Sequence, residues 1–434
     1  MVLTCKFLKT RNDYTERPAM TGLFLLFYFI FNGCVFSANY KPKIINIDVI
    51  GLDKTLQYVV DREIHHSVDV YIDSSIAALD RNRIFNLGLF EDVAWRLVPL
   101  ENGDAILQYI MVESINKTPP LLFPSYDEEK GWSLNALLMV KNLQGRNQTF
   151  EVFAGFGGQQ KIQLLFSDPW LFGDHVSLST YLERNSYDHL FLDRSINISS
   201  LKISIGKWYG EKIKLRFSPA LIKKSFTNSI NTLNYNFFTP ELKIELDTRD
   251  IFWNPTKGSR IIQSIIPMLG DNKFVVWNQS YSFFTPVYYN IVLGFNTTIQ
   301  RKIGHKNDVW LNYFGNSYNI RGWDLPGKNE SFDNYRFGHE FLFSSFELRK
   351  LFFNKNGDRF GFKKGICIVA FTDIGAINKN WKSISRNSML GGAGFGIRVP
   401  IPILQSVRID LGWGFKNKKF NKDLTLHFAV QQKF

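Results

Sequence analysis

The segment LTLHFAVQQKF (residues 424–434) closes the chain and alternates between apolar and polar side chains. Successive side chains of a strand face opposite sides, so this pattern predicts a strand with one apolar face. That face would carry Leu424, Leu426, Phe428 and Val430, and the chain ends on Phe434. The other face would carry Thr425, His427, Ala429, Gln431 and Lys433. Such a strand suits a soluble β-sandwich or a membrane β-barrel, and the rest of the chain separates the two.

Segments of the same kind repeat along most of the chain. From residue 131 onwards, roughly ten-residue stretches alternate in this way between turn residues. Examples are WSLNALLMVKNL (132–143), DVWLNYFG (308–315) and GICIVAFTDIG (365–375). Strands of ~9–11 residues in even number are typical of bacterial outer-membrane barrels, which must close because lipid cannot pair an open sheet edge. We therefore predict a mainly β fold, with an antiparallel transmembrane β-barrel of about 16 strands over residues 131–434.

The composition agrees with a barrel and disfavours other classes. Aromatic residues make up 15% of the 434 residues, yet mean hydropathy is −0.13, which fits strands that alternate lipid-facing and lumen-facing side chains. The net charge is +13, but Lys and Arg are scattered, so we expect no nucleic-acid partner. Three cysteines and seven histidines give neither a disulfide framework nor an HExxH pair, and no G-x-S-x-G occurs. We expect no enzyme activity, metal or cofactor.

The N-terminus is predicted to be an export signal. The run MTGLFLLFYFIFNGCVFSANY (20–40) holds about a dozen apolar residues after a basic segment, which suits a signal peptide better than a spanning helix. Small residues favour cleavage before Ala38, so residues 1–37 form the predicted signal peptide. A lipid attachment at Cys34 and a start at Met20 stay open.

Residues 41–115 predict a small α/β domain, followed by a linker over 116–130. KIINIDVIGL (43–52) reads as a strand, and TLQYVVDREIHHS (55–67) has helical spacing. A second helix is capped by Asp73 or Ser74, places Ile76, Leu79 and Ile84 on one face, and ends at Gly88. Two strands follow, within 90–100 and 105–114. This β-α-α-β-β order, with NLGLFEDV (86–93) at the junction, resembles a polypeptide-transport-associated (POTRA) domain, which implies capture of unfolded strands at its edge.

The sequence IRGW, formed by Ile320, Arg321, Gly322 and Trp323, lies in a long loop between the predicted strands eleven and twelve. Together with this loop, several blocks resemble the barrel of BamA-like outer-membrane assembly factors and two-partner secretion transporters, in the same order. The blocks are LLFSDPWLFG (164–173), DTRDIFWNPTKGSR (247–260), FELRKLFF (346–353), FTDIG (371–375) and GGAGFGIRVPI (391–401). The chain is thus similar to a short, BamA-like member of that superfamily with one POTRA domain.

The resemblance implies a role for the arginine. The loop folds back into the barrel, and acidic side chains from neighbouring strands pair with Arg321, since an unpaired buried charge is prohibitive. By position these partners are Asp373 and Glu347, with Asp247 or Asp250 as a further contributor. Gly322 would permit a tight backbone.

Two further positions are compared with the family. Trp323 stands where Phe or Tyr is commoner in that family, so its packing is expected to differ from theirs. The terminal aromatic after Phe428 and Val430, Phe434, resembles the recognition signal of outer-membrane proteins.

The implied function is insertion and assembly of β-barrel proteins into the bacterial outer membrane. The POTRA domain would capture strands in the periplasm, and the barrel would open sideways where its first and last strands pair weakly. Implied partners are unfolded outer-membrane β-barrel polypeptides, outer-membrane lipids and accessory assembly lipoproteins. The alternatives are a two-partner-type polypeptide secretion transporter of the same superfamily and a passive outer-membrane pore. A single POTRA domain departs from the usual number in both the assembly factors and the transporters.

Overall fold

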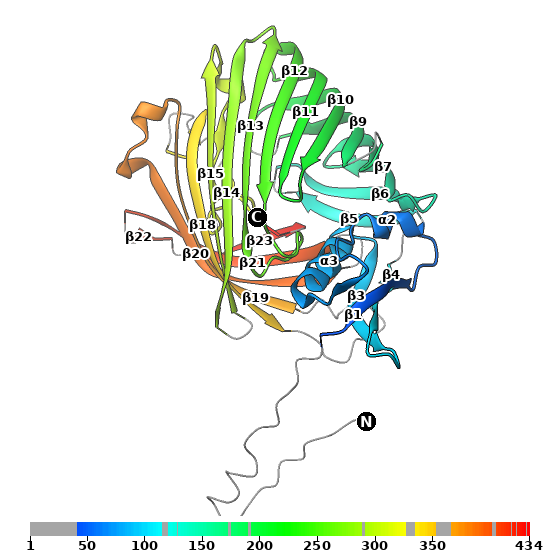
Figure 1. Cartoon of the computed structure of the whole chain (residues 1–434). Coiled ribbons are helices and arrows are strands. Elements are labelled where there is room, and N and C mark those ends of the chain that lie inside the picture. Colours follow the sequence, from blue (N-terminus) through cyan, green and yellow to red (C-terminus); the bar gives the residue numbers. More distant parts are fainter. Residues whose placement is uncertain are drawn as a thin grey trace, which may run out of the picture.

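The computed structural model describes residues 41–114, 120–127, 129–171, 175–189, 192–288, 291–326, 335–352, 366–401, 405–417, 419–421, 423–430 and 432–434. The predicted signal peptide (1–37), with Cys34, lies outside these residues. Among the described helices, none combines the length and the apolar character that a membrane crossing requires. The described chain forms a small α/β domain and one large antiparallel sheet (Figure 1).

The small domain contains two helices on a four-stranded sheet with the order β2-β1-β4-β3. β1 pairs parallel with β4, and β3 pairs antiparallel with β4. The elements follow the expected order with a two-residue strand, β2, added. They are β1 (Lys43–Ile50), α2 (Gln57–Asp61), β2 (Val70–Tyr71), α3 (Ser74–Asn86), β3 (Phe90–Pro99) and β4 (Ala105–Glu113).

Helix α3 begins where its cap was expected, but its buried face was predicted wrongly. The Asp73 carboxylate accepts hydrogen bonds from the backbone N–H groups of Ser75 and Ile76. The side chains that face the core are Ala77, Asp80 and Ile84. Ile76 and Leu79 are 36% and 53% exposed. The error arose because a buried carboxylate at Asp80 breaks the apolar pattern that marks the inner face of a helix.

Within the described residues, the large sheet has sixteen strands of six residues or more, each antiparallel to the next along the chain. A two-residue strand, β22 (Lys419–Phe420), pairs with the end of β21. The sixteen are β5 (Leu121–Asp127), β6 (Gly131–Leu143), β7 (Gln148–Gly157), β8 (Gln160–Asp168), β9 (Val176–Asp188), β10 (Ser195–Tyr209), β11 (Ile213–Thr227), β12 (Thr232–Asp247), β13 (Gly258–Gly270), β14 (Phe274–Tyr288), β15 (Ile291–Gly304), β18 (Glu340–Phe352), β19 (Ile366–Asn378), β20 (Met389–Ile401), β21 (Gln405–Lys416) and β23 (Thr425–Val430).

The predicted number of strands agrees with the structure because one strand was missed and another was wrongly assigned. Residues 121–127, placed in the linker, form β5 and pair with β6 from Leu121 to Asp127. Residues 308–315, read as strand eleven, instead form a 3₁₀ turn, η1 (Asp308–Trp310), and the two-residue strand β16 (Asn312–Tyr313), which pairs with β17 (Phe337–Gly338). Both errors arose from relying on alternation alone. The proline at position 124 made residues 121–127 look unlike a strand, and the alternating residues 308–315 belong to a packed loop.

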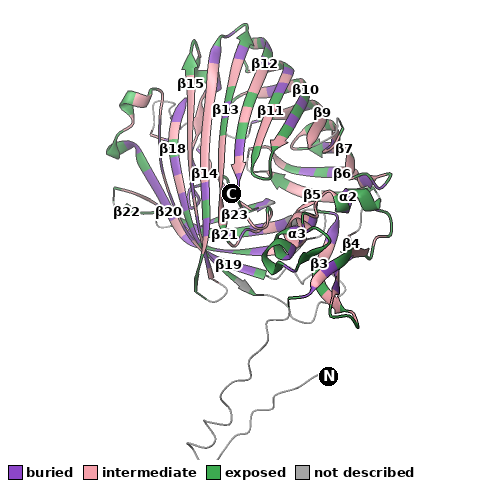
Figure 2. Ribbon diagram, viewed as in Figure 1, coloured by how far each residue is buried: buried purple, intermediate pink, exposed green. Residues whose placement is uncertain are grey.

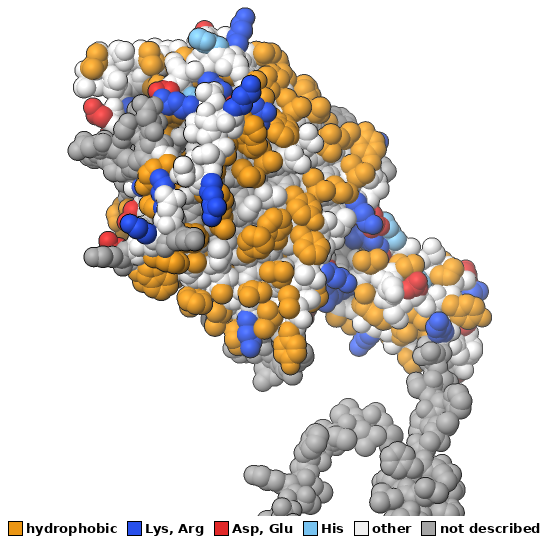
Figure 3. Space-filling view, turned by 90° about the vertical axis from the view of Figure 1, so that its left-hand side faces the viewer, with side chains coloured by type: hydrophobic (Ala, Val, Ile, Leu, Met, Phe, Trp, Pro, Cys, Tyr) orange, Lys and Arg blue, Asp and Glu red, His pale blue; other side chains and the backbone are white. Residues whose placement is uncertain are grey.

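The large sheet has the reverse of the usual polarity pattern. Small polar side chains such as Ser204, Ser218 and Thr239 are buried, while Leu201, Leu221 and other apolar side chains are exposed. Buried and exposed residues alternate along the strands in Figure 2. Figure 3 shows hydrophobic side chains spread over one outer face of the sheet. Because exposed large apolar patches mark a surface that contacts something other than water, the outer face requires an apolar environment.

The small domain contacts the hairpin turns at one end of the sheet. The Arg83 guanidinium donates to the Glu211 carboxylate at 2.8 Å, in the turn between β10 and β11. The Asn86 side-chain amide donates to the Asp250 carbonyl at 3.1 Å, in the turn between β12 and β13. On the other side, the backbone N–H of Leu56 donates to the Gly145 carbonyl at 3.0 Å. The small domain therefore marks one end of the sheet, and the loop that carries Arg321 leaves from the opposite ends of β15 and β18.

Candidate functional site: a buried arginine latch

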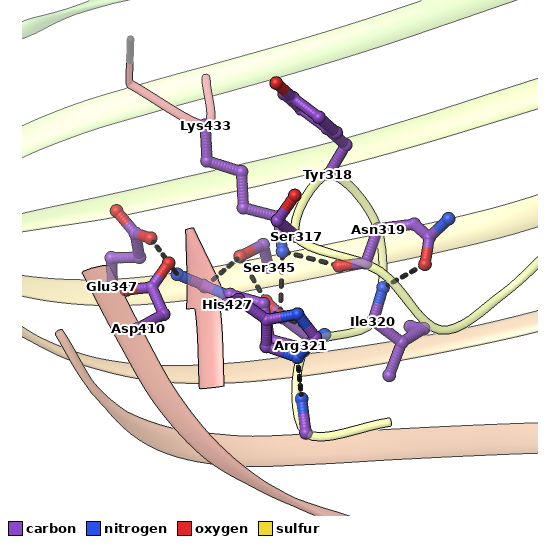
Figure 4. A network of polar contacts seen from close by, with 12 residues as sticks. Ser317, Tyr318, Asn319, Ile320, Arg321, Ser345, Glu347, Asp410, His427 and Lys433 are labelled. Carbon is purple, nitrogen blue, oxygen red and sulfur yellow. Dashed lines mark hydrogen bonds and ion pairs between the residues drawn. The ribbon is translucent and has the colours of Figure 1, made fainter. Parts of the chain in front are cut away.

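The loop between β15 and β18 brings Arg321 into the space that the sheet encloses. Arg321 is 0% exposed, although the loop that carries it connects two strand ends. Figure 4 shows this arginine surrounded by side chains from the loop and from facing strands. A fully buried guanidinium must find acceptors for its five N–H groups, so its partners define the site.

Asp373 on β19 is the principal partner. The Arg321 Nε donates to Asp373 Oδ2 at 2.8 Å, and Nη2 donates to Oδ1 at 3.0 Å, so the pair is bidentate. The backbone N–H of Arg321 donates to the same carboxylate at 3.1 Å. One aspartate thus fixes both the side chain and the backbone of the loop.

Two more carboxylates, one ring and the Ser345 hydroxyl, which accepts from Nη2 at 3.3 Å, are further contacts of Arg321. Its Nη1 donates to Glu347 Oε1 on β18 at 2.7 Å and to Asp410 Oδ2 on β21 at 3.2 Å. Its guanidinium carbon lies 3.6 Å from the centroid of the Phe371 ring. The arginine therefore joins the loop to three strands, and we call this set of contacts the latch: Arg321 with Glu347, Asp373 and Asp410.

Two of the acidic residues that were expected near Arg321 contact it, and the others do not. Glu347 and Asp373 contact it, as the resemblance implied. Asp247 does not belong to the latch: its carboxylate pairs with Arg249 at 2.7 Å, at the end of β12 near the small domain. Asp250 lies in the same turn, where it accepts from the Thr256 backbone N–H at 2.9 Å. Both belong to the DTRD segment, which lies where β12 ends, at the end of the sheet that contacts the small domain.

The residues beside Arg321 fit the loop tightly against the strands. Gly322 has φ +85°, and a Cβ there would lie 2.5 Å from the Trp413 carbonyl carbon, so only glycine fits. Its N–H donates to His427 Nε2 at 2.9 Å. The Trp323 indole N–H donates to the Gly391 carbonyl at 2.7 Å, and Ile320 is fully buried beside Trp323 in one apolar cluster. The unusual Trp323 thus adds a hydrogen bond to strand β20.

The glycines of β20 make room for this loop. A Cβ at Gly392 would lie 1.7 Å from the Arg321 carbonyl oxygen, which no rearrangement of side chains could relieve. Gly392 is also the register partner of Asp373 on the neighbouring strand. The glycine-rich sequence GGAGFG (391–396) therefore lets the loop backbone approach the sheet beside the carboxylate that holds it.

Cations outnumber carboxylates around the latch. Arg398 Nη1 donates to Asp410 Oδ1 at 2.6 Å, Arg349 pairs with Glu347 at 2.9 Å, and Arg408 lies 3.5 Å from Asp410. With Arg321 and Lys433, five cations meet the three latch carboxylates, and all eight side chains are at most 2% exposed. The buried Nη1 atoms of Arg349 and Arg408 have no hydrogen-bond partner among the described residues. The latch therefore carries an excess of buried positive charge, which is costly.

Sequence reasoning missed Asp410 and the three additional arginines. A signal existed, because Arg408 and Asp410 alternate with exposed Ile409 and Leu411 along one strand. Alternation gives the face of a strand but not its register against the loop, so it could not place Asp410 beside Arg321.

The end of the chain enters the same site, which corrects the expected terminal strand. β23 ends at Val430, and Phe428 is exposed on its outer face, as predicted. Phe434 does not continue that face: its ring packs against Phe284, 5.9 Å between centroids, in a cluster of inward-facing residues. Lys433 Nζ donates to Asp373 Oδ2 at 2.7 Å and to the Asn319 carbonyl at 2.6 Å. The last residues turn inward because these partners are available inside the sheet.

Comparisons with known proteins bear on this arrangement. The Omp85 superfamily domain matches residues 142–434. The fold is similar to that of BamA from Haemophilus ducreyi lacking POTRA domains 1–3, with a TM-score of 0.59 and 15% identity over 89% of this chain and 84% of that one. It is also similar to CdiB from Escherichia coli, with a TM-score of 0.59 and 12% identity over 89% and 76% of the two chains.

A third solved structure, CdiB from Acinetobacter baumannii, matches with a TM-score of 0.53 and 13% identity over 90% of this chain and 74% of that one. No curated protein sequence matches the chain. At these identities the solved structures show the fold, while the domain match shows the family. The chain belongs to the Omp85 superfamily and is a BamA-like member of it.

Proposed function

We propose that this protein inserts and assembles β-barrel polypeptides in the bacterial outer membrane, without a nucleotide or metal. The observation that carries the proposal is the latch: in an Omp85 superfamily member, Arg321 holds a loop inside the sheet through three carboxylates. A passive pore would gain nothing from filling its interior with a costly buried charge network. Such a network holds the loop inside the sheet while its ion pairs are intact and would free the loop when they break.

The large sheet is proposed to be a closed transmembrane barrel. Its outer apolar side chains and inner polar ones match the pattern of strands that face lipid on one side. The strand order places β23 next to β5 (Figure 1). Closure of this kind is needed in lipid, where unpaired edges cannot bond to water.

The pairing of the first and last strands supports sideways opening. β23 has six residues, whereas β10 and β11 each have fifteen. β5 has seven residues, so the two hydrogen-bonded neighbours β23 and β5 share a short junction. A weak junction is where the barrel would open and offer its edges as templates for incoming strands.

The small domain is proposed to be a single POTRA domain that lies in the periplasm and receives unfolded polypeptide. β2 and β3 are the outer strands of its sheet, so each offers one edge for strand addition. Its contacts with the turns at Glu211 and Gly145 place it at one end of the barrel. In this arrangement a captured strand would be held beside the interior that the latch occupies. Lipids of the outer membrane and accessory assembly lipoproteins are the remaining proposed partners.

The second candidate is a transporter that secretes one partner polypeptide through the barrel. The similarity to CdiB, equal in TM-score to that to BamA, favours it, and the latch would then hold the channel closed. The two candidates differ in what depends on the protein: many membrane barrels or one secreted chain.

Depletion of the protein, followed by quantitation of all outer-membrane proteins, separates these candidates. We expect a broad fall in unrelated barrels, reproduced by Arg321→Ala at normal protein level. Arg386→Ala is the matched control, because that arginine is exposed on a short helix, η4 (Arg386–Ser388). Loss of one secreted protein with unchanged barrels would instead establish the transporter. If neither the outer-membrane proteins nor the secreted proteins change, the passive pore is the alternative that remains.

A further inference from the structure

A polar cavity lies between the loop and the wall of the sheet, and Asn319, which accepts from Lys433, is one of its lining residues. It has a volume of about 400 Å³. Its walls come from the ends of β9, β10, β11 and β15 and from the loop segment around η1 and β16. These strand ends are opposite to the ones that contact the small domain. The volume is within the range that small-molecule sites occupy.

Three cationic side chains line this cavity with little compensation. Lys224 Nζ lies 5.0 Å from the Phe226 ring centroid and 5.3 Å from that of Trp310, and no described carboxylate is within ion-pair distance of it. Among the described residues, the Arg194 side chain donates to the Val309 carbonyl at 3.4 Å and lies 5.0 Å from the Phe226 ring centroid, and its buried Nε has no hydrogen-bond partner. Guanidinium and ammonium groups in such surroundings need an acceptor that the described residues do not supply.

The third cation, Lys302, has neutral hydrogen-bond partners in the part of the chain that the structure describes. Its Nζ donates to the Trp310 carbonyl at 2.5 Å and to Asn312 Oδ1 at 2.9 Å. These bonds orient the ammonium but leave its charge uncompensated. They also fix the loop segment that closes the cavity.

Two carboxylates lie in the cavity wall, but only one is available to these cations. The Asp308 side chain is 52% exposed and pairs with Lys379 at 3.1 Å, so its charge is directed elsewhere. Glu129 accepts a hydrogen bond from the Tyr313 hydroxyl. Three cations therefore face one carboxylate, which leaves a local excess of two positive charges.

Aromatic rings give the cavity a rigid apolar side. The Trp310 ring lies 5.4 Å from the rings of Phe226 and Tyr235, and 5.5 Å from that of Phe237, in edge-to-face contacts. Such a packed ring cannot move aside when the cavity fills. A ligand must therefore place an anionic group near Arg194 and Lys224 and a body with apolar C–H faces against the rings.

We propose that this cavity binds a phosphate monoester carried by a sugar-sized molecule. A phosphate monoester bears about −1.5 to −2 charges at pH 7, which matches the local excess, whereas a carboxylate bears only one. Arg and Lys side chains are the usual protein partners of phosphate. The ring faces contact the C–H groups of a sugar, and Glu129 offers an acceptor for its hydroxyl groups. The ligand source is either a free sugar phosphate or the phosphorylated headgroup of a glycolipid.

The test is calorimetric titration of the full-length protein in detergent with glucose 1-phosphate, and with glucose and inorganic phosphate for comparison. We expect glucose 1-phosphate to bind more tightly than inorganic phosphate, and glucose alone not to bind. Lys224→Met should weaken this binding about tenfold or more, as expected for the loss of a charged contact. Lys223→Met is the matched control, because the neighbouring side chain is exposed on the opposite face of β11.

A second arm identifies the source of the ligand. Phosphorylated glycolipid that co-purifies with the wild type, measured by mass spectrometry, should be lost in Lys224→Met and in Arg194→Gln but kept in Lys223→Met. Binding in either arm with this variant pattern supports the site, and the arm that gives it identifies the source. Absence of binding in both arms, or equal losses in Lys224→Met and Lys223→Met, would overturn the proposal.

Discussion

The protein buries charge in two places, and the two networks are built on different principles. In the small domain, the carboxylate of Asp80 is fully buried and accepts from the N–H groups of His65 and His66 at 3.0 Å and from the Tyr109 hydroxyl at 2.7 Å. Arg83 supplies the positive charge that matches this buried carboxylate, and it also pairs with Glu211 at the edge of the domain. Around the latch, five cations meet three carboxylates, and several N–H groups have no acceptor among the described residues. The fully buried charges are thus balanced in the small domain, whereas positive charge is in excess at the latch.

The largest effect is expected when the unbalanced network loses a carboxylate. Asp373→Asn removes the charge shared by Arg321 and Lys433 and raises the cation excess from two to three. Breaking a buried pair in this way costs about 3–5 kcal/mol, and we expect the upper end of that range. Urea unfolding of the protein in detergent measures it. An effect smaller than that of Arg321→Met would contradict the charge excess.

A somewhat smaller and strictly local effect is expected from Asp80→Asn. The substitution leaves Arg83 with Glu211, which is 42% exposed, as its carboxylate partner, and should destabilise the small domain by about 3 kcal/mol. Hydrogen exchange should rise across residues 41–114 and stay unchanged in the large sheet. Increased exchange in β18 to β21 would show that the two networks are not independent.

Lys433 offers a graded test of the latch. Lys433→Met removes two buried hydrogen bonds but also one excess charge, so we expect a loss of about 1–2 kcal/mol, less than for Asp373→Asn. The side chains are similar in length, which limits any cavity. Equal losses for Lys433→Met and Asp373→Asn, by the same urea titration, would mean that the lysine and not the carboxylate holds the site.

The sharpest contrast is expected at Arg349. Arg349 pairs with Glu347, but Glu347 also pairs with Arg321 and Arg398, and the Arg349 Nη1 has no hydrogen-bond partner among the described residues. Because Arg349→Met also removes one excess positive charge, we expect the free energy of unfolding to change by about 1 kcal/mol or less, or to increase. Arg83→Met in the balanced network is the comparison and should destabilise the small domain. Similar losses for the two arginines would remove the distinction between the networks.

The smallest effect concerns pH and the small domain. Burial raises the pKa of Glu63 from 4.5 to about 7, against the opposing effect of nearby Arg83 and Arg62. The folded state therefore holds a proton that the unfolded state releases, so stability falls as pH rises from about 4.5 to 7 and is level above that. Hydrogen exchange of the small domain should be faster at pH 7.5 than at pH 5 after correction for intrinsic rates. Glu63→Gln should remove the difference, and a variant that retains it would exclude Glu63 as its cause.

Three of the four latch residues could be predicted from the sequence, whereas several strand boundaries could not. Arg321 with Glu347 and Asp373 could be found because a buried arginine must have acidic partners and because the surrounding blocks resemble a known family. Asp410 could not, since the register between strands is a tertiary property. The inward turn of Lys433 and Phe434 was equally hidden, because alternation up to Val430 gives no sign of where a strand stops pairing. Local patterns thus give the face of a residue, while its partners depend on how strands align.

Reconstitution tests the central claim most directly. The purified protein is placed in liposomes, an unfolded outer-membrane β-barrel polypeptide is added, and the folded fraction is followed over time by heat-dependent gel mobility. We expect faster folding than in empty liposomes, a large loss of this gain in Arg321→Ala, and none in Arg386→Ala. Folding no faster with the wild-type protein than with empty liposomes would contradict the assembly function.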